Sequence, residues 1–160
     1  MRQHTMAQYW LWPAGLFGLA LLVGYPPQDG MGAGAPTLAL WLEIPAHVRV
    51  GQPVLLQAKV QNTSSRTEEL TFGGRPAYDF VVTRPDGLEV WRWSHGQGIQ
   101  AILEHKTLQP GEVVEFAAEW GQRDNEGQPV PAQTYWVRGI VHLESPEQLE
   151  SAPRPLRIAP

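Results

Sequence analysis

Apolar and polar residues alternate along most of this chain, and the alternation constrains the fold more than any other feature. Over residues 54–62 the even positions are apolar up to Val60, and most odd positions are polar. Side chains of a β-strand point alternately to the two faces of a sheet, so this pattern is typical of a half-buried strand. The sequence therefore predicts an all-β domain of antiparallel strands. The pattern recurs over residues 38–44, 78–83, 114–120 and 135–143.

Turn residues separate these segments at short intervals. In Arg84-Pro85-Asp86-Gly87 the proline presets the backbone dihedral and the glycine closes the turn, which predicts a hairpin. Seven to nine strands without a long helix between them favour an immunoglobulin-like antiparallel β-sandwich. Residues 47–50 are expected to extend the strand at 38–44, and shorter strands are expected at 69–72 and 88–93. Loops are expected at 94–98 and 121–133, and either a strand or a helical turn at 100–108.

The beginning of the chain differs from the rest in composition. Residues 3–28 contain no Asp, Glu, Lys or Arg, and 10–24 form a nearly continuous apolar run of 15 residues. A membrane-spanning helix needs about 20 residues and the apolar region of a signal peptide about 7–15. We expect residues 1–36 to be a signal peptide or an N-terminal membrane anchor, attached through 10–24, plus a linker. A buried core helix is the alternative.

This interpretation divides the chain into three parts. Residues 37–144 are expected to form the sandwich. Residues 145–160 are expected to be a Pro- and Glu-rich tail, in which Leu156 and Ile158 either add a short edge strand or trail from the domain. On this interpretation the protein is exported, or anchored outside the cytoplasm.

Charge and residue types exclude several classes of function. The 12 basic and 16 acidic residues give a net charge of −4, which lacks the basic excess of a nucleic-acid-binding protein. No cysteine is present, so disulfides, thiolate nucleophiles, cysteine zinc sites and a lipid-modified N-terminal cysteine are excluded. The five histidines form no H-E-x-x-H motif, and adjacent Ser94-His95 is poorly placed for a nucleophile and its base. We predict no catalytic activity, no cofactor and no metal site.

Two tryptophans form the densest local signal. In Trp91-Arg92-Trp93-Ser94 the two rings share one strand face, about 7 Å apart. Either both rings fill the core between the sheets, or one is an exposed anchor for a binding partner. Arg92 lies on the opposite face, where it could pair with Glu89 or Asp79.

Several short motifs follow one another along the chain and together resemble a known family. They are Asn62, Leu70-Thr71-Phe72, Tyr78-Asp79-Phe80-Val81-Val82, Asp86-Gly87, Val90-Trp91-Arg92-Trp93-Ser94, Leu108-Gln109-Pro110-Gly111-Glu112 and Trp120. In this order they resemble the intracellular proteinase inhibitor (BsuPI) family over roughly residues 48–143. The resemblance implies an immunoglobulin-like sandwich that inhibits a bacterial serine proteinase of the subtilisin type. It implies no catalytic residue and no cofactor, and the family name implies the cytoplasm as the alternative location.

We therefore expect a monomeric, non-catalytic domain with a protein partner, possibly a serine proteinase. Without disulfides to brace a substrate-like loop, binding through a surface or an edge strand fits better. A cell-envelope structural or interaction module with no inhibitory activity is the alternative. The candidate loops are 73–76, 94–98 and 121–133, and the candidate protein-binding residues are Arg75, Trp91, Trp93, His95, Gln97, Arg123 and Asn125.

Overall fold

The computed structural model describes residues 36–72, 76–98, 104–144 and 148–160. The predicted signal or anchor segment therefore lies outside the described residues, apart from residue 36. The described residues form β-strands joined by turns and loops, and none of them is helical. The strands are β1 (Leu38–Glu43), β2 (His47–Arg49), β3 (Val54–Asn62), β4 (Glu68–Phe72), β5 (Tyr78–Thr83), β6 (Glu89–Arg92), β7 (Glu104–Leu108), β8 (Val113–Trp120), β9 (Thr134–His142), β10 (Gln148–Glu150) and β11 (Arg154–Ala159).

No helix in the described ranges has the length and apolar character needed to cross a membrane.

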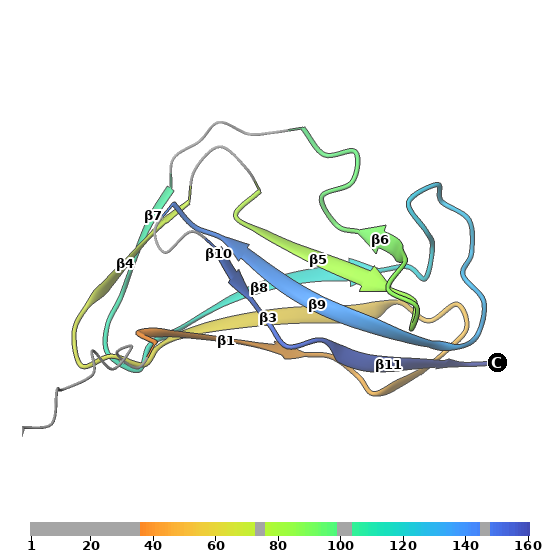
Figure 1. The fold of residues 1–160 in the computed structure, drawn as a ribbon, viewed down its shortest axis with the longest axis horizontal. Coiled ribbons are helices and arrows are strands. Elements are labelled where there is room, and N and C mark those ends of the chain that lie inside the picture. Colours follow the sequence, from red (N-terminus) through yellow and green to blue (C-terminus); the bar gives the residue numbers. More distant parts are fainter. Residues whose placement is uncertain (1–35, 73–75, 99–103, 145–147) are drawn as a thin grey trace, which may run out of the picture. The chain divides into compact units, whose positions relative to one another are not determined.

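The strands build two facing sheets and a two-stranded extension (Figure 1). The first sheet has the order β1-β3-β8, and the second has the order β2-β11-β9-β5-β6, with β10 also pairing with β9. Neighbouring strands are antiparallel, except that β11 runs parallel to β2. The predicted immunoglobulin-like β-sandwich is confirmed. The described residues contain eleven strands rather than seven to nine. Residues 47–49 form a separate strand, β2, instead of extending β1, and both β10 and β11 lie in residues expected to be a tail.

The alternating apolar residues of both sheets meet in the main core. Leu56 of β3 and Trp120 of β8 are fully buried from one sheet, and Phe80 of β5 and Val137 of β9 from the other. Gly139 of β9 lies where the sheets come close together. A Cβ atom at that position would lie 3.1 Å from the Cβ of Ala58 and 3.2 Å from Cδ1 of Leu42. A side chain there would require Ala58 and Leu42 to move by a few tenths of an ångström.

A buried asparagine forms the corner between the first sheet and its extension. Asn62 ends β3, and beyond it the chain continues into β4, which pairs with β7. Its amide nitrogen donates to the carbonyls of Arg66 (2.7 Å) and Leu108 (2.9 Å). Its side-chain oxygen accepts from the backbone N–H of Ser64 at 2.9 Å. These side-chain hydrogen bonds join the end of β3 to the segment before β4 and to the end of β7. A second cluster of buried apolar side chains includes Val60 of β3, Leu70 of β4 and Leu108 of β7.

The C-terminal segment corrects one expectation. Residues 154–159 form β11, which lies between β2 and β9 and is neither a tail nor an edge strand. Leu156 pairs with Tyr135 of β9, Ile158 pairs with Val48 of β2, and both apolar side chains are buried. A short segment with only two inward apolar residues looks the same at an edge and in a sheet interior. Its position depends on pairing with a strand more than a hundred residues earlier.

Candidate functional site

Three segments meet beside β6. They are the turn 84–88 between β5 and β6, the segment 93–98 that follows β6, and the loop 121–133 between β8 and β9. The turn has the predicted form, because Gly87 has a φ of 86° and its N–H donates to the carbonyl of Arg84 at 2.9 Å. Of the two predicted loops, 94–98 follows β6 along the chain, and 121–133 is hydrogen-bonded to β6 through Asn125.

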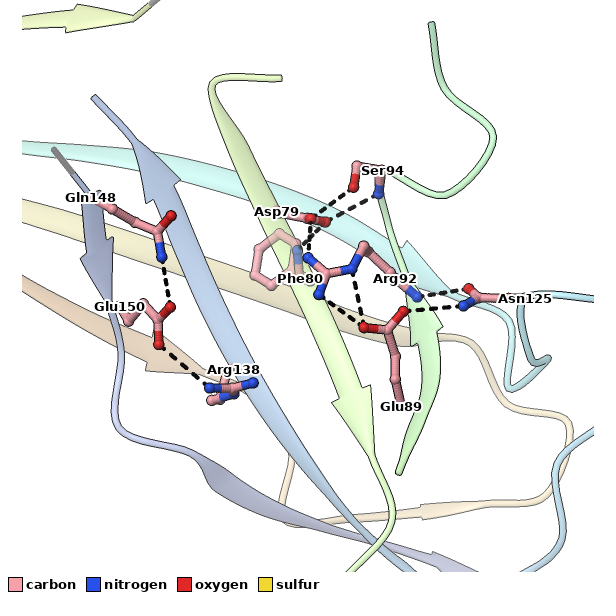
Figure 2. Close-up of polar contacts among 9 residues, drawn as sticks. All are labelled: Asp79, Phe80, Glu89, Arg92, Ser94, Asn125, Arg138, Gln148 and Glu150. Atoms are coloured by element: carbon pink, nitrogen blue, oxygen red, sulfur yellow. Dashed lines mark hydrogen bonds and ion pairs between the residues drawn. The ribbon is translucent and has the colours of Figure 1, made fainter. Parts of the chain in front are cut away.

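A buried carboxylate organises the segment after β6 (Figure 2). Asp79 of β5 is 1% exposed. Its Oδ1 accepts from the backbone N–H groups of Phe80 (2.9 Å) and Ser94 (3.1 Å). Its Oδ2 accepts from the guanidinium of Arg92 (2.8 Å) and the hydroxyl of Ser94 (2.7 Å). A buried carboxylate is stable only when its lone pairs are used, and here both oxygens have partners that also fix the segment after β6.

Arg92 joins this carboxylate to a second one. Its Nη1 contacts Asp79 at 2.8 Å, while its Nε (3.1 Å) and Nη2 (2.8 Å) donate to Oε2 of Glu89. The predicted pairing of Arg92 with Glu89 or Asp79 is confirmed, and it involves both residues. The hydrogen bonds to Glu89, followed by the bond to Asp79, raise the pKa of Arg92, so the guanidinium stays charged.

Asn125 fastens the long loop to β6. Its side-chain oxygen accepts from the backbone N–H of Arg92 at 2.9 Å, and its amide donates to Glu89 at 3.2 Å. Its own backbone N–H donates to the carbonyl of Val90 at 3.0 Å. The loop thereby covers part of the outer side of β6, which ends the second sheet and would otherwise present unpaired backbone groups.

The two tryptophans of this segment pack inward. Trp93 stacks on Tyr78 with ring centroids 4.4 Å apart, and Trp91 lies 6.1 Å from the ring of buried Trp120. Both are half-buried and pack against the main core. The hydroxyl of Tyr78 donates to the carbonyl of Ala117 at 3.0 Å, which connects the second sheet to β8. Of the two alternatives for these rings, the packing agrees with core filling.

The other candidate residues lie on the surface around this core. His95 and Gln97 are exposed on the turn after β6, and the Gln97 amide donates to the carbonyl of Trp93 at 2.8 Å. Arg123 is exposed in the long loop, where its guanidinium donates to the carbonyl of Gly127 at 2.8 Å. Arg75 lies outside the described residues. Among the predicted residues, His95, Gln97 and Arg123 are therefore exposed on the two loops, and Asn125 is partly buried.

Sequence reasoning missed the residue that anchors the base of the long loop. Gln122 is 3% exposed and has a φ of 55°, an unusual value for a residue with a side chain. Its amide nitrogen donates to the carbonyls of Arg49 (2.8 Å) and Gln52 (2.7 Å), and its oxygen accepts from the N–H of Gly51 at 2.9 Å. A glutamine within a polar loop carries no sequence signal for such a role.

The two loops beside β6 form a surface with a fixed backbone, and Ser94 and His95 are not arranged as a nucleophile and its base. The hydroxyl of Ser94 donates to Asp79, so its hydrogen is committed to a buried carboxylate and not to His95. Within the described part of the chain, no three His, Cys, Asp or Glu side chains come together as metal ligands would. What the site provides is a set of exposed polar side chains on two loops whose backbones are held by hydrogen bonds.

The two tyrosines near this site make the stability of the fold sensitive to alkaline pH. Burial raises the pKa values of Tyr78 and Tyr135 above their usual value near 10, because the charged phenolate is poorly solvated there. The folded state therefore holds these protons more tightly than the unfolded state. The free energy of unfolding should stay level up to about pH 10 and decrease as the pH rises further. Urea unfolding at a series of pH values measures the decrease.

Tyr78→Phe provides the control for this pH effect. The variant loses the hydrogen bond to Ala117 at every pH, but its further loss of stability between about pH 10 and 11 should be smaller than in the wild type. An identical alkaline decrease in both proteins would contradict the assignment to Tyr78.

Comparisons with known proteins identify one matching family and several solved structures of low sequence identity. A family model described as BsuPI, intracellular proteinase inhibitor, matches residues 44–144. No curated protein matches the chain. Among solved structures, the CARDB domain of a Pyrococcus furiosus protein is 14% identical, with a TM-score of 0.43, covering 77% of this chain and 94% of that domain. A β-glucosidase from Listeria innocua in complex with glucose is 13% identical, with a TM-score of 0.43, covering 77% of this chain and 16% of that enzyme.

Proposed function

The chain belongs to the intracellular proteinase inhibitor (BsuPI) family, and on this premise we propose that it binds and inhibits a serine proteinase of the subtilisin type. Membership of this family supports a role as a proteinase inhibitor, and the subtilisin-type target is our proposal. The fold supports a role in binding, because two loops with exposed polar side chains are held beside β6.

The observation that carries this proposal is the hydrogen-bonded network around Asp79. It fixes the segment 93–98 through Ser94 and Arg92, and Asn125 ties the long loop to the same strand. Binding is weakened by the entropy lost when flexible loops become ordered. A loop surface that is already ordered loses little on binding, which suits an inhibitor that has no disulfide to brace it.

The surface we propose for the proteinase is formed by His95, Gln97 and Arg123. All three side chains are exposed. The backbone N–H groups of His95 and Gln97 donate to the carbonyls of Arg92 and Ser94, both at 3.0 Å, and the carbonyl of Arg123 accepts from the indole of Trp120 at 2.8 Å. Trp91 and Trp93 act beneath this surface, where they support the loops from the core side. Arg75 remains a proposed contact from the sequence alone.

A titration against subtilisin tests this proposal. We expect the full chain to slow hydrolysis of a peptide substrate at micromolar concentration. The double variant His95→Ala/Gln97→Ala should weaken inhibition roughly tenfold, which corresponds to about 1.4 kcal/mol of binding free energy. His47→Ala provides a matched control, because His47 is an exposed histidine on β2. A folded protein that does not slow any subtilisin-like proteinase would refute the proposal.

The apolar segment 10–24 favours a second candidate function, a binding module of the cell envelope. On this alternative the protein is exported or anchored, and its loops bind an envelope protein without inhibiting a proteinase. Cell fractionation combined with the mass of the mature chain tests the location. A full-length chain found entirely in the cytoplasm would contradict it.

A further inference from the structure

A groove lies between the β5–β6 turn and the long loop, and His95, Gln97 and Arg123 are not among its lining residues. It has a volume of about 780 Å³ and is enclosed by the turn between β5 and β6 on one side and by residues 124–133 on the other. Apolar atoms contribute much of its lining, and the Leu88 side chain there is 55% exposed. The apolar lining residues are Pro85, Leu88, Val90, Pro129, Val130 and Pro131.

The charges around this groove are mostly negative. Asp86, Glu89, Asp124 and Glu126 line it, and Arg84 is the one cation among its lining residues. The Arg84 guanidinium pairs with Asp86 at 2.8 Å, and Glu89 pairs with Arg92. Among the described residues, no cation pairs with Asp124 or Glu126. Within the described ranges, the groove therefore has two carboxylates that form no ion pair.

Both walls of the groove are held in place. Oδ1 of Asp124 accepts from the backbone N–H groups of Glu126 (3.1 Å) and Gln128 (2.7 Å), which fixes one wall as a tight turn. On the other wall, Oδ1 of Asp86 accepts from the N–H of Leu88 at 3.1 Å. The side chain of Glu126 makes no hydrogen bond or ion pair within the described part of the chain, and it is exposed. The groove is thus preformed and has one charged group free to meet a ligand.

We propose that this groove binds an extended segment of a partner protein that carries a lysine or arginine beside apolar residues. The cation would balance Glu126 and Asp124, while the apolar residues would cover Leu88 and the prolines. Removing exposed apolar surface from water supplies affinity, and the opposite charges select the segment. The inference rests on the proposed protein-binding function, because it names the chemistry of the partner segment.

Two labelled peptides test the proposal. Both are eight residues long, rich in leucine and proline, and identical except that the central residue is arginine in one and glutamate in the other. Fluorescence anisotropy with the full chain measures their dissociation constants. We expect the arginine peptide to bind roughly tenfold more tightly at low salt, and the difference should shrink as salt screens the charges. Equal binding of the two peptides, or no binding of either, would overturn the proposal.

Two charge reversals localise the binding. Glu126→Lys should weaken binding of the arginine peptide roughly tenfold. Glu119→Lys changes the net charge of the protein by the same amount, on an exposed glutamate of β8 outside the groove, and should leave that binding unchanged. If both variants lost affinity for the arginine peptide equally, the preference for arginine would be due to net charge, and the proposal that the groove binds the peptide would be overturned. Leu88→Ser should weaken the binding of both peptides, because it removes the exposed apolar side chain that they would cover.

The same preparations in the subtilisin assay separate this inference from the proposed function. Inhibition of subtilisin without peptide binding would refute the proposed role of the groove but not the proposal that the protein is an inhibitor. Selective peptide binding that Glu126→Lys abolishes, without inhibition of any proteinase, would support the groove and refute the proteinase as the partner.

Discussion

Replacing Asp79 by alanine is expected to lower the free energy of unfolding by about 3–5 kcal/mol. The carboxylate is buried and accepts hydrogen bonds from two backbone N–H groups, the Ser94 hydroxyl and the Arg92 guanidinium. Without it, these donors lose their acceptor in a site from which water is largely excluded, and the cation keeps only Glu89 as a partner. Urea unfolding followed by tryptophan fluorescence measures the change.

Asp86→Ala is the matched control for this prediction. Asp86 also pairs with an arginine at 2.8 Å, but its side chain is 60% exposed. Arg84 and the backbone N–H of Leu88 lower the pKa of Asp86 by hydrogen bonding to its charged form. Water competes for an exposed pair, so the control should change stability little. Equal effects of the two substitutions would contradict the view that burial of Asp79 makes its network important.

Replacing Leu156 by aspartate is expected to have the largest effect on the fold. Leu156 is fully buried on β11, between β2 and β9, and belongs to the main core. A carboxylate at this position would be isolated from water and from any cation in the core, which costs at least about 4 kcal/mol. That amount is a large part of the stability of a typical domain. We expect little soluble protein, and a strongly lowered urea midpoint in any that is recovered.

Arg157→Asp separates the effect of burial from that of sequence position. Arg157 is the next residue along β11 and is exposed. The same new side chain should be tolerated there, with a change within about 0.5 kcal/mol, as is usual for surface substitutions. If Leu156→Asp were tolerated equally well, β11 would not be part of the sheet interior.

Local patterns predicted the strands whose side chains alternate over many residues. β3 and β8 alternate along most of their length, so both their existence and their buried faces followed from the sequence. β11 has only two inward apolar residues, and its partners lie far away in the chain. Nothing local distinguishes an interior strand of that kind from a tail.

The same limit applies to the site. The sequence suggested that Arg92 pairs with Glu89 or Asp79. Residues three apart in a regular strand point to opposite faces, but β6 has a register shift against β5 between Val82 and Thr83, which no local pattern predicts. The sequence named Asn125 only as a candidate protein-binding residue. Its position beside β6 depends on how the long loop folds back, which is set by Gln122 and the turn at Asp124. Those contacts connect residues that no pattern relates.

The parallel pairing of β2 with β11 has a consequence for the speed of folding. It joins residues 47–49 to residues 157–159, so this part of the sheet closes only after most of the intervening chain has been brought into place. Folds with such a high contact order cross their folding barrier slowly. If the pairing forms late, it is absent from the transition state, and its contacts then slow unfolding. For a protein proposed to meet a proteinase, rare opening of β11 would protect the chain from cleavage as much as the affinity of its loops would.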